Sequence, residues 1–281
     1  MDIDPSYIYL AVWFVIALVV FKRACKGGFF NKYSFHPLPE IRAIDLLRGF
    51  GGYIFMAAIF VPFVFVRFVL HNKNGKISTL SNIEILTMHA CIVAGCFLAC
   101  LCAYLCLTTE MRRRLWNTTE VSSWHNFRLG MVSWFLIYPV MMIASQLLAH
   151  IVNYIFPHPW IEQDMLQNLR QAMSYKMLFT IMVFLTVTLV PLTEEFLFRG
   201  LLQSWFRRRM GRFLAIGTTS IVFALVHYSP VMGYANIELM GAIFLLSCVL
   251  GYLYERQRSL WASLGLHSFF NFMTIIFIVF Q

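Results

Sequence analysis

Two adjacent glutamates and an arginine stand inside an otherwise apolar stretch of the chain. Between Met177 and Phe206, the only charged residues are Glu194, Glu195 and Arg199. A helix of this length, at about 1.5 Å per residue, would cross a bilayer, so the three charges would lie at membrane depth. Ionisable groups there cost about 3 kcal/mol or more each, and they usually mark a functional site.

Helical geometry separates the roles of the two acids. Glu195 and Arg199 are four residues apart with the acid first, so they can pair within one helix. Glu194 points about 100° away around the helix axis and needs a partner from another helix. The alternative is that both acids are structural and pair with Arg199.

Three more polar residues stand in later apolar stretches: His227, His267 and Asn271. Phe223 precedes His227 by four residues and His267 precedes Asn271 by four, so each pair would share a helix face. Counted from the nearest arginine on the inner side, Glu194 and these three residues lie about 14 to 22 Å along their helices at roughly 1.5 Å per residue. We therefore expect the four groups to converge at a similar depth.

A carboxylate beside two imidazoles and an amide can activate water and stabilise an oxyanion, which is the chemistry of a hydrolase. A serine nucleophile is not indicated, because the chain has no Gly-x-Ser-x-Gly motif. The competing interpretation is a zinc site made by Glu194, His227 and His267, since two histidines and a glutamate are a known catalytic ligand set.

The elements that must carry these residues are transmembrane helices. The chain of 281 residues is 60% hydrophobic and 12% charged, with a mean hydropathy of +0.71, which excludes an ordinary soluble domain. The pattern predicts an all-α, polytopic transmembrane helix bundle of about eight spans. The predicted spans are 7–21, 50–70, 85–107, 129–156, 177–206, 213–228, 237–254 and 260–280.

Most of the 22 Lys and Arg residues fall on one side of these spans. The positive-inside rule then places both termini outside and the basic segments in the cytoplasm. The net charge of +9 is explained by topology and by contact with the lipid bilayer, so we expect no nucleic-acid partner. Without a recognisable cleavage site, the first span is expected to remain as an anchor.

Three short motifs follow one another on successive apolar stretches: Glu194-Glu195-x-x-x-Arg199, Phe223-x-x-x-His227 and His267-x-x-x-Asn271. In this order they resemble the motifs of the CPBP family (CAAX protease and bacteriocin-processing, also called ABI) of glutamic intramembrane endopeptidases. The resemblance lies within 177–280. We accordingly divide the chain into a three-span region without a recognisable motif, 1–128, and a protease-like core, 129–281.

The resemblance implies a glutamate mechanism that needs no cofactor. Glu194 with His227 would activate the attacking water, and His267 and Asn271 would support the oxyanion. The neighbouring Glu–Arg pair and Phe223 would be supporting residues. Zinc remains the alternative.

The function expected on these grounds is that of a membrane-embedded peptidase, hydrolysing a peptide bond near the cytoplasmic half of the membrane. Its substrate would be a membrane-associated protein or peptide, which could be prenylated or carry a leader. The alternative is a non-catalytic membrane factor, a transporter or a bacteriocin-immunity-type protein, that uses the same polar cluster for binding. We expect a multi-pass protein of a prokaryotic inner membrane.

Overall fold

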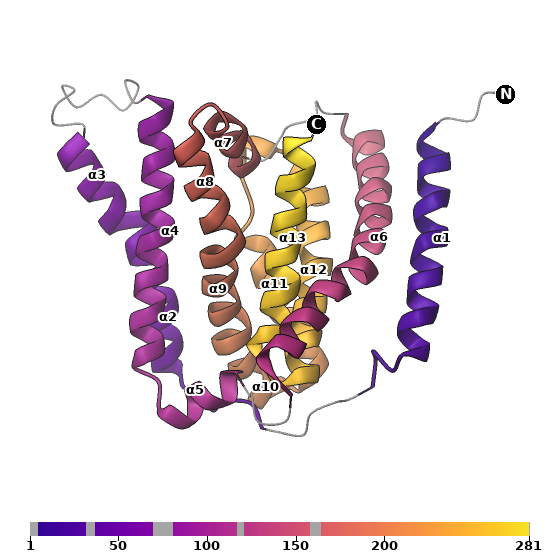
Figure 1. The fold of residues 1–281 in the computed structure, drawn as a ribbon, viewed down its shortest axis with the longest axis horizontal. Coiled ribbons are helices and arrows are strands. Elements are labelled where there is room, and N and C mark those ends of the chain that lie inside the picture. Colours follow the sequence, from indigo (N-terminus) through magenta and orange to yellow (C-terminus); the bar gives the residue numbers. More distant parts are fainter. Residues whose placement is uncertain (1–4, 32–36, 70–80, 117–120, 158–163, 281) are drawn as a thin grey trace.

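The computed structural model describes residues 5–31, 37–69, 81–116, 121–157 and 164–280, and every regular element in them is a helix. The helices pack side by side as a bundle (Figure 1). They are α1 (Pro5–Lys26), α2 (Ala43–Ile54), η1 (Phe55–Phe60), α3 (Val61–Val69), α4 (Asn82–Leu105), α5 (Thr109–Trp116), α6 (Ser123–Ile155), α7 (Asp164–Ala172), α8 (Lys176–Phe184), η4 (Leu185–Leu189), α9 (Val190–Glu195), η5 (Phe196–Gln203), α10 (Ser204–Met210), α11 (Arg212–Leu225), η6 (Pro230–Met232), α12 (Ala235–Gln257) and α13 (Leu260–Val279).

Six continuous helices in the described parts are long and apolar enough to cross a membrane. They cover Ala43–Phe68, Asn82–Leu105, Ser123–Ile155, Lys176–Met210, Ala235–Gln257 and Leu260–Val279. The apolar helix α11 is shorter, and α1 has 22 residues. The predicted all-α bundle is confirmed, and the number of helices agrees roughly with the eight predicted spans.

The helices alternate in direction through the bundle (Figure 1). The start of α1 and the end of α13 lie at the same end, whereas α5 and α10 lie at the opposite end. Both of these short helices are basic in their last turns, as is α1. The charge asymmetry that the sequence shows is therefore an asymmetry between the two ends of the bundle.

The helix from Lys176 to Met210 includes two π-helical segments, η4 and η5. Glu194 and Glu195 lie on α9, the single stretch of α-helix between these segments. π-helical turns accommodate an extra residue, and they are frequent at functional sites. The sequence periodicity did not predict them.

Two glycines bring α6 and α13 into backbone contact. A Cβ atom added at Gly130 would collide with the carbonyl oxygen of Ala262, and one added at Gly265 would collide with the carbonyl oxygen of Phe127. Small residues at a helix interface permit such close approach inside membranes. The contact fixes the position of α13 against α6, and α13 carries two of the predicted catalytic residues, His267 and Asn271.

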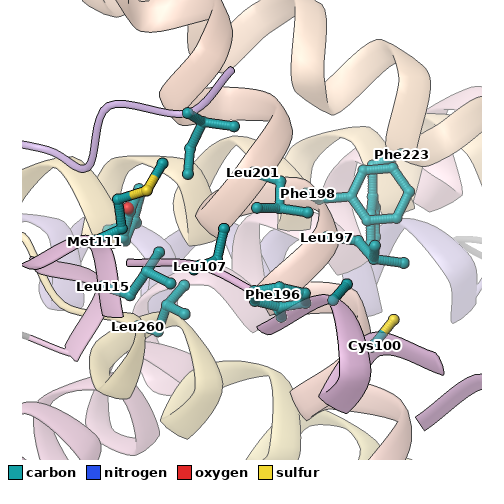
Figure 2. Close-up of a cluster of buried hydrophobic side chains, with 13 residues drawn as sticks. Cys100, Leu107, Met111, Leu115, Phe196, Leu197, Phe198, Leu201, Phe223 and Leu260 are labelled. Carbon is teal, nitrogen blue, oxygen red and sulfur yellow. The ribbon is translucent and has the colours of Figure 1, made fainter. Parts of the chain in front are cut away.

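A buried apolar cluster joins the N-terminal helices to the helix that carries the glutamates (Figure 2). Side chains of η5 lie at its centre, between residues of α4 and α5 and residues of α11 and α13. Its members include Cys100, Leu107, Met111, Leu115, Phe196, Leu197, Phe198, Leu201, Phe223 and Leu260. The motif-free region therefore packs directly against the segment that follows the two glutamates. The division of the chain at residue 128 stays a prediction.

Candidate functional site

Glu195 and Arg199 form a fully buried ion pair. The Arg199 Nη1 atom donates to Glu195 Oε1 at 2.9 Å, as the spacing of four residues predicts, and the two side chains are 0% and 1% exposed. Arg199 Nη2 also donates to the Ser247 hydroxyl at 2.8 Å, so the pair is tied to α12. The guanidinium lies 4.5 Å above the ring centroid of Phe223 on α11, a favourable cation–π distance.

His267 on α13 lies between the two glutamates. Its Nδ1 atom is 2.8 Å from Glu195 Oε1, and its Nε2 atom is 3.6 Å from Glu194 Oε2. A carboxylate can only accept, so Nδ1 carries the proton in the first contact. The imidazole is therefore oriented by Glu195 and presents Nε2 toward Glu194.

Glu194 differs from its neighbour in exposure and in partners. Its side chain is 16% exposed, and the Nε2 atom of His267 lies 3.6 Å from its Oε2 atom, beyond ordinary hydrogen-bond distance. On another side, Glu194 lines a cavity of about 40 Å³ together with Thr193 and Tyr53. This carboxylate is thus the less constrained of the two, as the helix geometry predicts.

His227 does not lie within a helix. The sequence predicts a span to residue 228, but α11 ends at Leu225 and His227 follows in a turn. Its Nδ1 atom donates to the Phe223 carbonyl oxygen at 2.7 Å, which leaves Nε2 as an acceptor in the neutral ring. The ring centroids of Phe223 and His227 are 4.8 Å apart, and those of Phe223 and His267 are 6.0 Å apart. Phe223 therefore connects the two imidazoles with the buried ion pair.

The loop after α11 explains the early helix end. The Asn236 side chain accepts from the Ser229 amide at 2.9 Å and donates to the carbonyl oxygens of Ser229 and Gly233 at 2.7 and 2.9 Å. Gly233 has a φ of 51°, in the left-handed region that favours glycine. These bonds hold a compact turn directly after residues 226–228, the last three residues of the predicted span.

Asn271 on α13 binds the π-helical backbone of η4. Its Nδ2 atom donates to the Thr186 carbonyl oxygen at 2.9 Å. In the π pattern, the amide of Val190 donates to the Leu185 carbonyl, and the corresponding donor for Thr186 would be residue 191, which is proline and has none. Asn271 supplies the missing bond. A primary amide has two N–H donors, so one remains for another acceptor.

Within the described residues, no three His, Cys, Asp or Glu side chains are grouped so that they could hold a metal ion. The zinc alternative requires Glu194, His227 and His267 to converge on one ion. Contacts link Glu194 to His267, whereas His227 is linked to the site through Phe223. The three side chains are not grouped as a ligand set in this arrangement, and whether the protein needs a metal stays a prediction.

Sequence reasoning missed Ser247, Thr193 and Tyr53. Ser247 is the one Ser or Thr residue in the apolar α12, where a partner for the buried arginine could have been sought. Thr193 directly precedes the two glutamates. Tyr53 on α2 gave no signal, because nothing in the sequence shows that α2 lies beside the carboxylate.

A comparison with family models finds that residues 176–273 match the Rce1-like family, described as type II CAAX prenyl endopeptidase Rce1-like. The matched segment contains all seven predicted site residues. It agrees with the resemblance drawn from the motifs. No curated protein and no solved structure matches the chain.

Proposed function

From the match of residues 176–273 to the Rce1-like CAAX prenyl endopeptidases, we propose that the protein hydrolyses a peptide bond with water activated by Glu194. The family supports an intramembrane endopeptidase that acts on membrane-associated protein substrates. The glutamate mechanism and the position of the reaction in the cytoplasmic half of the membrane are our proposal. So is a substrate that carries a prenyl group.

The observation that carries the proposal is the chain of contacts that begins at Glu194. Arg199 neutralises Glu195, Glu195 orients His267, and His267 faces Glu194. Because Glu194 forms no ion pair with an arginine or lysine among the described residues, its carboxylate is available to take a proton from water. The second carboxylate is committed to the buried pair, so the two adjacent glutamates have different roles.

The remaining polar groups would stabilise the charge that develops on the substrate. A protonated His267 could donate from Nε2 to an oxyanion, and Asn271 has a second N–H donor for the same purpose. The Nε2 atom of His227 would act with Glu194 as a base that accepts a proton from the attacking water. We propose that no metal takes part in this reaction.

We further propose that the basic end of the bundle, with α5 and α10, faces the cytoplasm and that both termini lie outside. Several long apolar helices and the family support an integral, multi-pass membrane protein. The orientation itself rests on the positive-inside rule. A prokaryotic inner membrane as the location also remains our proposal.

The test is hydrolysis of prenylated CAAX peptides by the purified protein in liposomes. Glu194→Gln is nearly isosteric and should lower kcat by about 100-fold or more, the contribution of a positioned base. Glu110→Gln is a matched control, because this glutamate lies on α5 and pairs with Arg114 at 2.7 Å. Full activity of Glu194→Gln would refute the glutamate mechanism.

If the intact protein cleaves none of the peptides, the membrane proteome of cells that carry it should be compared with that of cells that carry Glu194→Gln. A membrane protein that is found in a shortened form only in cells with the unmodified enzyme is the substrate. Identical proteomes would favour the non-catalytic alternative, in which the polar cluster binds a ligand without turnover.

A further inference from the structure

Three arginines from three different elements meet at the basic end of the bundle. Arg207 lies in the last turn of α10, Arg212 is the first residue of α11, and Arg258 directly follows α12. Arg207 Nε and Arg258 Nη1 lie 3.4 and 3.2 Å from the same Glu255 Oε2 atom, and the Arg212 guanidinium lies 5.2 Å from the ring centroid of Tyr252. Burial lowers the pKa of Arg258, and the positive charges of Arg207 and Arg212 lower it further. The three guanidiniums are therefore close enough to repel one another.

The charges of this arginine cluster are not balanced within the described part of the chain. Glu255 is shared by two of the arginines, so three guanidiniums face one carboxylate there. The Nε atoms of Arg212 and Arg258 are buried, and neither has a hydrogen-bond partner among the described residues. The positive-inside rule accounts for basic residues at this end, but Arg258 is only 9% exposed, and buried charges are normally paired. The cluster therefore favours a bound anion.

The backbone around the cluster makes the absence of an anion still less favourable. Arg212 opens α11, where the helix dipole is positive and a basic side chain is disfavoured. The N-cap residue is Gly211, and no side chain caps the first amides of this helix. Arg258 has a φ of 53°, the only positive φ of a non-glycine residue in the described parts of the chain, at a position after a helix where glycine is preferred. An anion at the start of α11 would interact favourably with the amides and with the guanidiniums.

The surface of α11 beside the cluster is apolar and exposed. Phe213, Leu214, Ile221 and Leu225 are each at least 52% exposed, and no atom lies within 4 Å of a Cβ placed at Gly217. At about 100° per residue, these five positions fall within roughly 120° of the helix circumference. The apolar strip therefore begins at Arg212 and runs along the helix away from the cluster. A ligand with both a phosphate group and acyl chains matches this combination of charged end and apolar side.

We propose that the arginine cluster binds the phosphate group of an anionic phospholipid whose acyl chains lie along α11. Guanidiniums match the geometry of phosphate oxygens, and basic pockets between transmembrane helices bind anionic head groups. Arg207 ends the helix that carries the two glutamates, and α12 carries Ser247, which binds Arg199. The bound lipid thus stabilises the ends of three helices that surround the candidate site. This binding does not depend on the proposed function.

The binding test uses the purified full-length protein in a neutral detergent. Phosphatidylglycerol should raise the melting temperature and should be retained as a single molecule in native mass spectrometry. Phosphatidylcholine, whose head group has no net charge, should bind at least about tenfold more weakly, because each uncompensated basic residue near the membrane surface favours an anionic lipid. Inorganic phosphate at the same concentration should produce no comparable shift, since it lacks the acyl chains.

Arg212→Gln is the variant that tests the site without leaving a buried carboxylate unpaired. It should weaken phosphatidylglycerol binding by about tenfold or more, because a charge-assisted hydrogen bond is lost. Arg113→Gln is the matched control, since it removes the same charge from an exposed position in the last turn of α5, at the same end of the bundle. Without lipid, Arg212→Gln should change the melting temperature little, because the lost contact with Tyr252 is offset by reduced repulsion.

Four results would overturn the proposal. Equal binding of the two phospholipids, or equal weakening by Arg212→Gln and Arg113→Gln, would show non-specific attraction to the basic end. An equal shift with inorganic phosphate would show a site for free phosphate rather than for a lipid. If Arg212→Gln loses as much stability without lipid as with it, the arginine has only a structural role.

Discussion

Glu195→Gln should destabilise the fold far more than Glu194→Gln. The substitution removes the charge that balances Arg199, whose side chain is 0% exposed, and weakens the acceptor for His267. Removing one partner of a buried ion pair costs about 3 to 5 kcal/mol. At about 1.4 kcal/mol per factor of ten, the unfolding equilibrium constant should rise roughly 10²- to 10⁴-fold. Glu194 makes no such pair, so Glu194→Gln should cost about 1 kcal/mol or less.

The measurement is the free energy of unfolding of each purified variant in the same detergent. The control is Glu195→Gln combined with Arg199→Met, which removes both charges and leaves none uncompensated. This double variant should recover much of the stability that Glu195→Gln loses, because the two residues interact directly. Full recovery is not expected, since Arg199 also binds Ser247 and lies over Phe223.

The reasoning is refuted if Glu194→Gln is the unstable variant and Glu195→Gln is stable but inactive. The roles of the two glutamates would then be reversed. It is also refuted if the double variant is less stable than Glu195→Gln alone, because the lost stability would then not come from an uncompensated arginine.

Three further outcomes are expected. Activity should persist after dialysis against a strong chelator, and elemental analysis should find no stoichiometric zinc; activity lost on dialysis and restored by zinc would contradict this. With the native cysteines replaced, Ser174→Cys should react with an impermeant thiol reagent in intact cells and Arg208→Cys should not, and reversed labelling would invert the topology. Asn271→Leu should lower both the melting temperature and kcat, because the Thr186 carbonyl loses its donor; an unchanged melting temperature would show that this bond is not structural.

The contacts within one helix could be predicted from the sequence. The spacing of Glu195 and Arg199 determines their pairing, and the same geometry turns Glu194 away. The contact between Glu195 and His267 could not be predicted, because it depends on how α13 is rotated against α9. The sequence order of the motifs contains no information on this rotation.

Departures from regular helix were the other features that the sequence did not reveal. The apolar pattern continues past Leu225, although the helix ends there because Asn236 holds the following turn. The π-helical segments η4 and η5 could not be predicted either, because a π-helix and an α-helix in a membrane have the same apolar composition. Pro191 was a visible signal, but only the structure shows that the carbonyl it leaves without a donor is bound by Asn271.

The backbone contact between α6 and α13 bears on how a membrane-bound substrate could reach the glutamates. A lateral gate between two helices must open and reclose, and here even one added methyl group would collide with main-chain atoms. The interface between α6 and α13 is therefore too tightly packed to serve as a gate, and we expect a substrate to enter laterally through another part of the bundle. The side facing α4 is the natural choice, because the cavity that Glu194 lines reaches that helix. The three N-terminal spans would then decide which substrates reach the site.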